Sequence, residues 1–230
     1  MSNNIQRNAS NTLEPTVPLP IALLIFFSTG IITIAIVLML PLLFGPGVNV
    51  AWDLTRTSGI VAYLVMWLSI VFGLLITNRL AQLWPGGPVA LDLHQFTSLL
   101  GLAFSLFHAF ILLGDHYVKY TLAQILIPFA SSNYQPIWVG MGQLAFYLLI
   151  PVTFSFYMRR SLGAEAWRLV HAASFFAFAM ITIHGLLAGS DSKNLMVLSM
   201  YAVTGASVVF LTIYRMMTMV VSPPAQENHS

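Results

Sequence analysis

Long apolar runs separated by short polar breaks dominate the pattern of the chain. Each run is long enough for one membrane-spanning helix, which needs about 20 apolar residues. The six runs cover residues 20–44, 56–78, 91–113, 137–158, 167–188 and 195–217. The pattern predicts an all-α polytopic membrane protein with a six-transmembrane-helix bundle at 20–217. An N-terminal segment at 1–19 and a short tail at 218–230 flank the predicted bundle.

Composition agrees with this pattern and narrows the chemistry. Hydrophobic residues make up 58% of the 230 positions and charged residues 7%, whereas soluble proteins are about a quarter charged. Membrane lipid is therefore an expected partner. The absence of cysteine excludes thiolate metal sites and cysteine-ligated iron–sulfur clusters, so any metal must bind nitrogen or oxygen. The net charge of +2 and the lack of a basic block argue against a nucleic-acid partner.

The basic residues predict how the bundle is oriented. Because successive runs alternate direction, the connections sort into two sides. One side carries Arg7, Arg79, Arg159, Arg160, Arg168 and Arg215, and the other carries Arg56, Lys119 and Lys193. Cytoplasmic connections carry the excess of positive charge, so we expect the first side and both termini to face the cytoplasm. The expected location is the cytoplasmic membrane.

One connection, at residues 115–136, differs from the others. Its middle, TLAQILIPF, is too apolar for a free loop and too short to span a bilayer. Two interpretations are open at this point. The segment either forms a lid over the outer mouth of the bundle, or lies on the membrane surface, where aromatic residues gather. The aromatic residues concerned are Tyr117, Tyr120, Tyr134 and Trp138.

Four of the six histidines lie on two runs that start on the same side. His94 and His108 are fourteen residues apart, and His171 and His184 are thirteen apart, which correspond to about 21 and 19.5 Å along a helix axis. His94 should therefore lie level with His171 near the inner face, and His108 level with His184 near the outer face. Histidine pairs on neighbouring helices can supply both axial ligands of a b-type haem. The sequence predicts two stacked, non-covalent bis-histidine haems.

Two other uses of these histidines, and one geometric question, stay open. Intramembrane histidines can also brace helices or relay protons, as in a non-redox transporter or an assembly subunit, although transporter sites gather near the midplane. Fourteen positions return to within about 40° of the same helix face, whereas thirteen land about 140° away. The second helix therefore needs a tilt, a π-type irregularity or another angle of approach to the cofactor.

Several further residues could contribute to such sites. Arg168, one turn from His171, is a candidate partner for an inner haem carboxylate, although the charge bias of cytoplasmic connections explains it equally well. His116 in the outer segment lies either at an acceptor site or on an exposed loop. Phenylalanines at the depth between the two histidine levels either contact the cofactors or fill the core. They are Phe104, Phe107, Phe175, Phe176 and Phe178.

These residues resemble the ferric reductase-like transmembrane domain, which is shared by ferric-chelate reductases, NADPH oxidases and the haem-binding subunit of bacterial methionine sulfoxide reductase. The resemblance covers about residues 52–217, and the spacing of the paired histidines is its specific element. Its strongest parts are RTSGIVAYLVMWLSIVFGLLITNR (56–79), LHQF with LFHAFILLGDHYV (93–118), PFASSNYQPIWVGMGQLAFYLLI (128–150) and RRSLGAEAWRLVHAASFFAFAMITIHGLLAGSDS (159–192).

The resemblance implies that His94 and His171 bind the inner haem, that His108 and His184 bind the outer haem, and that electrons flow outward. It also implies that Arg56 lies near the outer haem, where it could bind a propionate or an anionic acceptor; an ion pair with Asp53 is the alternative.

Larger members of the family carry a flavin and nicotinamide domain after the last helix, and no such site is expected in this chain. The donor would then be a separate cytoplasmic flavoprotein or a quinol. The acceptor would be an outer-side protein, ferric chelate or oxygen, which would make the chain an oxidoreductase component. An accessory subunit that lacks the acceptor site is a further alternative.

Overall fold

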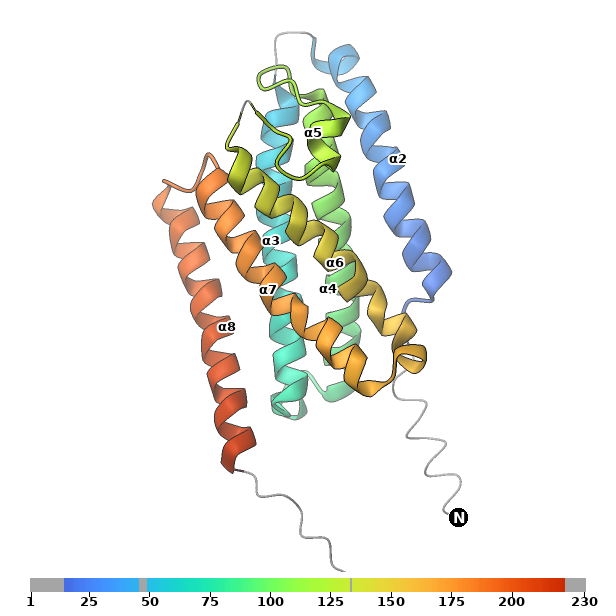
Figure 1. The fold of residues 1–230 in the computed structure, drawn as a ribbon, viewed down its shortest axis with the longest axis vertical. Helices are drawn as coiled ribbons and strands as arrows, with labels where there is room; N and C mark the ends of the chain where they lie inside the picture. The colour runs from blue at the N-terminus through green and yellow to red at the C-terminus, as the bar shows by residue number, and fades with distance from the viewer. Residues whose placement is uncertain (1–14, 46–48, 133, 222–230) are drawn as a thin grey trace, which may run out of the picture.

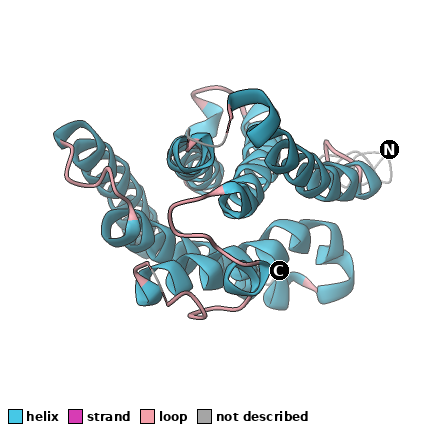
Figure 2. Cartoon of the chain, turned by 90° about the horizontal axis from the view of Figure 1, so that it is seen from above, coloured by secondary structure: helices cyan, strands magenta, loops and turns pink. Residues whose placement is uncertain are grey.

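The computed structural model describes residues 15–45, 49–132 and 134–221, and every regular element among them is helical (Figure 2). Six long helices are each long and apolar enough to cross a membrane, which confirms the predicted all-helical, multi-pass architecture. They are α2 (Leu19–Phe44), α3 (Val50–Thr77), α4 (Gly87–Phe110), α6 (Pro136–Leu162), α7 (Ala164–Ala188) and α8 (Leu195–Val221). Three short elements complete the described fold: the 3-10 helices η1 (Leu80–Gln82) and η2 (Ile111–Gly114), and the helix α5 (Leu122–Leu126).

The six long helices alternate direction along the chain (Figure 1). The lower end of the bundle in Figure 1 holds the start of α2, the end of α8 and the α3–α4 and α6–α7 connections; the upper end holds the α4–α6 and α7–α8 connections. Both ends of the described chain therefore lie at the lower end. The predicted N-terminal segment up to residue 14, and the predicted tail from residue 222, lie outside the described residues.

Two helices begin earlier than the apolar pattern predicts, and local chemistry explains both. The side-chain oxygen of Asn49 accepts a hydrogen bond from the Trp52 backbone N–H at 3.3 Å, so α3 starts at Val50. Pro88 lies in the first turn of α4, where its missing N–H costs nothing. As a result Arg56 lies inside α3 and not at its start.

Packing divides the bundle into a core and a periphery. The most extensive contacts join α3 to α4 and α6 to α7, while α2 packs mainly on α4 and α8 mainly on α3. Side chains of α2 such as Leu24, Ile31 and Leu42 are exposed, as expected for a helix that faces lipid. The α8 helix is held to α3 by polar contacts, including Tyr63 with Thr204 (2.6 Å). The four central helices therefore form the main walls of the bundle interior, and α8 adds to them beside α3.

The segment between α4 and α6 is fastened over the upper end. A capping box of Thr121 and Gln124 starts α5. From α6, the Gln143 side-chain N–H₂ donates to the carbonyl oxygens of Gln124 and Ile125, both at 2.7 Å, and the Gln143 side-chain oxygen accepts from the Phe129 N–H at 3.3 Å. One side chain therefore holds both halves of the segment.

Replacing Gln143 by leucine is expected to release this segment. Three hydrogen bonds would be lost, and the part-buried carbonyl groups of Gln124 and Ile125 would be left without this donor, at a cost of up to about 1–3 kcal/mol each. Hydrogen–deuterium exchange should show faster exchange of the amides around α5 and Phe129, while the middle of α3 stays protected. The control is Gln82→Leu at the lower end, where the residue is exposed. Unchanged protection of α5 in Gln143→Leu would contradict this role.

Candidate paired-histidine sites

The structure brings the four intramembrane histidines together in two pairs. His94 on α4 faces His171 on α7, with 5.7 Å between ring centroids and 73° between ring planes. His108 on α4 faces His184 on α7, with 6.1 Å and 81°. The first pair lies toward the lower end and the second toward the upper end, the pairing that matched depths predict. We call them the lower pair and the upper pair.

The thirteen-residue spacing on α7 is accommodated by the tilt of the helix. The α7 helix is continuous from Ala164 to Ala188 and contains no π turn. Figure 1 shows α6 and α7 crossing α3 and α4 obliquely. An oblique helix presents different faces to α4 at its two ends, so His171 and His184 can both reach their partners. Of the three explanations left open by the sequence, tilt is the one observed.

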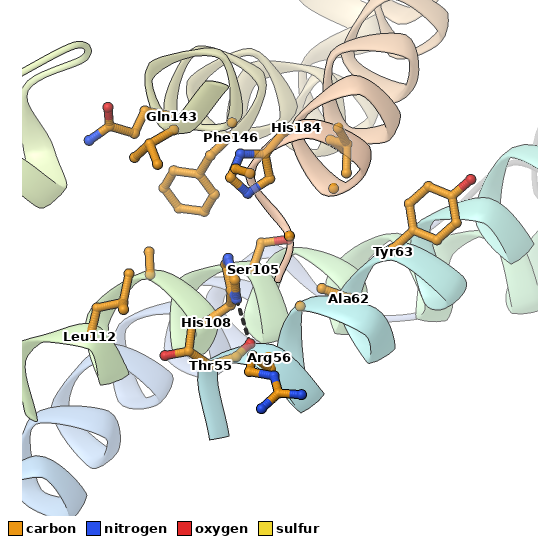
Figure 3. Close-up of a pocket in the computed structure, with 18 of the residues that line it drawn as sticks. Thr55, Arg56, Ala62, Tyr63, Ser105, His108, Leu112, Gln143, Phe146 and His184 are labelled. Atoms are coloured by element: carbon orange, nitrogen blue, oxygen red, sulfur yellow. Dashed lines mark hydrogen bonds between the residues drawn. The ribbon is translucent and has the colours of Figure 1, made fainter. Parts of the chain in front are cut away.

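Backbone carbonyls hold three of the four imidazole rings in one orientation. The Nδ1 atoms of His94, His108 and His184 lie 2.7–2.8 Å from a carbonyl oxygen of a neighbouring helix. The carbonyls belong, in the same order, to Ser69, Thr55 and Trp138. Because a carbonyl can only accept, each Nδ1 carries the hydrogen and each Nε2 keeps a free lone pair. Histidines that bind metals characteristically use this arrangement; Figure 3 shows it for His108.

The separation of the rings suits a single metal between them. Two imidazoles bound through Nε2 at about 2 Å each have those nitrogens about 4 Å apart, and each ring centre lies one ring radius further out. The observed 5.7 and 6.1 Å between centroids are in this range. Among the described residues, no group of three or more histidine, aspartate or glutamate side chains could hold a metal.

Glycines on neighbouring helices make room for three of the rings. A Cβ atom at Gly142 of α6 would lie 2.6 Å from His184 Nδ1, and one at Gly59 of α3 would lie 2.9 Å from His108. At Gly73 the corresponding distance to His94 is 3.3 Å. Gly59 and Gly73 are fourteen residues apart, as are the two α4 histidines that they face. This matched spacing on adjacent runs is a signal in the sequence that the histidine pattern alone did not reveal.

A cavity of about 200 Å³ adjoins the upper pair, His108 and His184. Its walls are mainly apolar, and Phe146 lies beside His184 in Figure 3. Tyr120 and Tyr134 of the segment between α4 and α6 also line it. That segment therefore covers the cavity as a lid, as the first interpretation predicts, and it also exposes the apolar side chains that the membrane-surface interpretation predicts, at Leu122, Leu126, Ile127 and Phe129. Burial raises the pKa of both tyrosines, so their hydroxyls stay neutral donors.

The aromatic residues of the lid differ in their contacts and exposure. Tyr134 donates from its hydroxyl to the Ala188 carbonyl at 2.7 Å, which ties the lid to the end of α7. Tyr117 is exposed, as is His116, and neither lines the upper cavity. The structure therefore places His116 on an exposed loop outside the upper cavity. His229 lies outside the described residues.

A second cavity, of about 400 Å³, adjoins the lower pair, His94 and His171. Arg159 and Arg215 line it. Arg168, the predicted carboxylate partner, is exposed and does not line this cavity. The residue one turn before His171 that does line it is Trp167, whose ring stacks on His171 with 5.2 Å between centroids and 22° between planes.

Arg56 lines the upper cavity, beside the histidine pair to which the resemblance assigns it, and its main partner was not predicted. Its guanidinium binds Asp191 of the α7–α8 connection through two hydrogen bonds, one of them Nε to Oδ2 at 2.7 Å. The expected contact with Asp53 is also present, at 3.4 Å. The guanidinium lowers the pKa of Asp191 by hydrogen bonding, so this carboxylate stays charged. An anion arriving at Arg56 would compete with Asp191.

Aliphatic side chains separate the two cavities. Met66, Leu149 and Ile181 each line both of them. Met66 reaches this position because Gly101 lies opposite, where an added Cβ would overlap the Met66 sulfur. Of the phenylalanines expected between the levels, Phe178 is buried, whereas Phe176 is 66% exposed and faces outward. The partition therefore depends on residues that the sequence did not single out.

Comparisons of the chain with protein-family models, with curated proteins and with solved structures found no match. The features of this chain that indicate a function are therefore the two histidine pairs, their carbonyl partners and the cavities beside them.

Proposed function

We propose that this chain is a di-haem b-type transmembrane electron-transfer protein. The observation that carries the proposal is that each end of the bundle holds a histidine pair whose geometry leaves imidazole nitrogens available to one metal. Attachment would be non-covalent, because the sequence has no cysteine. The expected iron ligands are His94 with His171 and His108 with His184.

The haems would supply the one-electron chemistry, and the chain would set the conditions for it. Carbonyl hydrogen bonds fix three imidazole orientations, and the glycines let the rings pack directly on helix backbones. The mainly apolar walls keep water from the ligands. Between the levels, Met66, Leu149 and Ile181 fill the space with a dry medium. The protein's role is thus to bind, to orient and to exclude water.

The direction of transfer in this proposal follows from charge. The described arginines that the sequence assigns to the cytoplasmic side belong to the lower end, and they are Arg79, Arg159, Arg160, Arg168 and Arg215. On the charge bias of cytoplasmic connections, the lower pair would be the cytoplasmic one. Electrons would pass from a cytoplasmic-side donor, a flavoprotein or a quinol, through the lower haem to the upper haem. They would leave to an outer acceptor beneath the lid. The resemblance to the ferric reductase-like family agrees with this direction.

Purified protein, made with adequate haem supply, is expected to contain about two haems b per chain, because there are two bis-imidazole sites. Pyridine haemochrome analysis against protein concentration measures the ratio. A low-spin spectrum would indicate that both axial positions are filled by imidazole. A ratio near zero would refute the proposal and favour a transporter or assembly subunit that uses the histidines as braces.

A further inference from the structure

Buried nitrogen atoms without an acceptor gather at the lower cavity. Among the described residues, five buried side-chain atoms have no hydrogen-bond partner, and three of these are nitrogens: Gln95 Nε2, Trp167 Nε1 and His171 Nδ1. All three residues line the lower cavity. The upper cavity has one such atom, Thr55 Oγ1. Native proteins leave few buried polar groups unpaired, so a cluster of them beside a cavity points to a ligand that supplies acceptors.

The orientation of the Gln95 amide is fixed by its other end. Gln95 is only 8% exposed, and its Oε1 accepts a hydrogen bond from the Thr16 backbone N–H at 2.9 Å. Because a backbone N–H can only donate, the amide cannot be turned round without losing this bond. Nε2, with its two hydrogens, is therefore a donor for which the described chain provides no acceptor.

Trp167 supplies the second donor. An indole N–H can only donate, and the ring is held in place by stacking on His171. Gln95 follows His94 directly in the sequence, and Trp167 precedes His171 by one turn. The two unpaired donors therefore accompany the two histidines of the lower pair, one beside each.

The two cavities also differ in the charged residues that line them. Arg159 and Arg215 line the lower cavity, and no aspartate or glutamate is among its described lining residues. At the upper cavity, Arg56 is already bound by Asp191. The lower cavity thus offers neutral donors and the positive charge of two arginines to an anionic group; Arg215 also donates to the Thr77 carbonyl, and Arg159 lies over the Phe156 ring. The upper cavity offers one arginine, which is paired with a carboxylate.

We propose that Gln95 Nε2 and Trp167 Nε1 donate hydrogen bonds to the haem carboxylates at the lower pair, with Arg159 and Arg215 supplying compensating charge. The upper haem would lack an equivalent carboxylate anchor. This inference rests on the proposed function, since it assumes that haem binds. A separate carbonyl compound such as a quinone is the other source of acceptor oxygens.

The test compares protohaem with its dimethyl ester, which keeps the iron and the ring but has no free carboxylate. The full chain carrying His108→Ala and His184→Ala keeps only the lower pair; produced without haem in detergent, it is titrated with each compound by absorbance. We expect the ester to bind about tenfold more weakly than haem, because one to two hydrogen bonds would lose the charge of the carboxylate that strengthens them. Gln95→Leu and Trp167→Phe should each weaken haem binding several-fold more than ester binding, because the ester carbonyl is a neutral and weaker acceptor than a carboxylate. Retained ester binding also shows that the variants fold.

The reciprocal protein, with His94→Ala and His171→Ala, keeps the upper pair and serves as the matched control. It should bind haem and ester with similar affinity.

Equal binding of both compounds at the lower pair would overturn the carboxylate proposal and leave haem binding intact. Equal weakening of both by Gln95→Leu would also overturn it. If Gln95→Leu instead weakened binding of a short-chain quinone alone, the donors would serve that ligand. Absence of binding by either compound in every protein would refute the proposed function as well.

Discussion

Under the proposed function, replacing His108 by alanine is expected to reduce haem content from about two to about one per chain, because His184 alone would be left to hold the upper haem. The lower pair lies about 20 Å away along the helices, so it should keep its haem and its low-spin spectrum. That haem should still be reduced by a donor on the lower side, while transfer to an outer acceptor fails.

His171→Ala should interrupt electron transfer at the other end of the bundle. The lower haem should be lost, and reduction of the upper haem from the lower-side donor should be interrupted. Haem content and the reduction spectrum with a low-potential donor measure both variants. His116→Ala is the matched control, because His116 is exposed and lines neither cavity; it should retain both haems. If His108→Ala kept both haems and outward transfer, His108 would not be a ligand, and His116, eight residues further on, would be the first replacement to examine.

The depth of each histidine could be predicted from the sequence, and its surroundings could not. Depth depends on rise per residue, which is nearly constant in a helix, so fourteen and thirteen residues were enough to pair His94 with His171 and His108 with His184. Which side chains meet those rings depends on helix rotation and tilt. Spacing alone places both Trp167 and Arg168 within about 60° of the His171 face. The structure puts the indole on the ring and the guanidinium outside.

Polar contacts between residues far apart in the sequence could not be predicted, for a similar reason. Arg56 and Asp191 are 135 residues apart, and they meet because the end of α7 comes close to the start of α3. Local spacing could suggest only Asp53, which proves to be the longer contact. The start of α3 is different: Asn49 followed by Trp52 and Asp53 is a local capping signal, and attention to it would have placed the helix start correctly.

Gly142→Ala is expected to have the second large effect, loss of the upper haem. The added Cβ would lie 2.6 Å from His184 Nδ1 and 2.8 Å from its Cγ, closer than real Cβ contacts allow. The same Nδ1 donates to the Trp138 carbonyl, one turn earlier on α6. The ring therefore cannot move away from the methyl group without losing the bond that orients it. We expect a stability cost of about 1–3 kcal/mol from overpacking.

Gly205→Ala in α8 is the control that separates the contact with His184 from the general effect of replacing glycine by alanine in a helix. A Cβ at Gly205 would meet nothing within 4 Å. The substitution should raise helix propensity by up to about 1 kcal/mol and leave both haems bound.

The other glycines that face histidine rings provide a graded series. Gly59→Ala (2.9 Å from His108) should also empty the upper site, whereas Gly73→Ala (3.3 Å from His94) should perturb the lower site only mildly. Haem content and thermal unfolding measure the series. If Gly142→Ala bound two haems with an unchanged spectrum and the thermal stability of Gly205→Ala, His184 could not lie against α6 as the structure places it, and the upper pair would have to be sought elsewhere on α7.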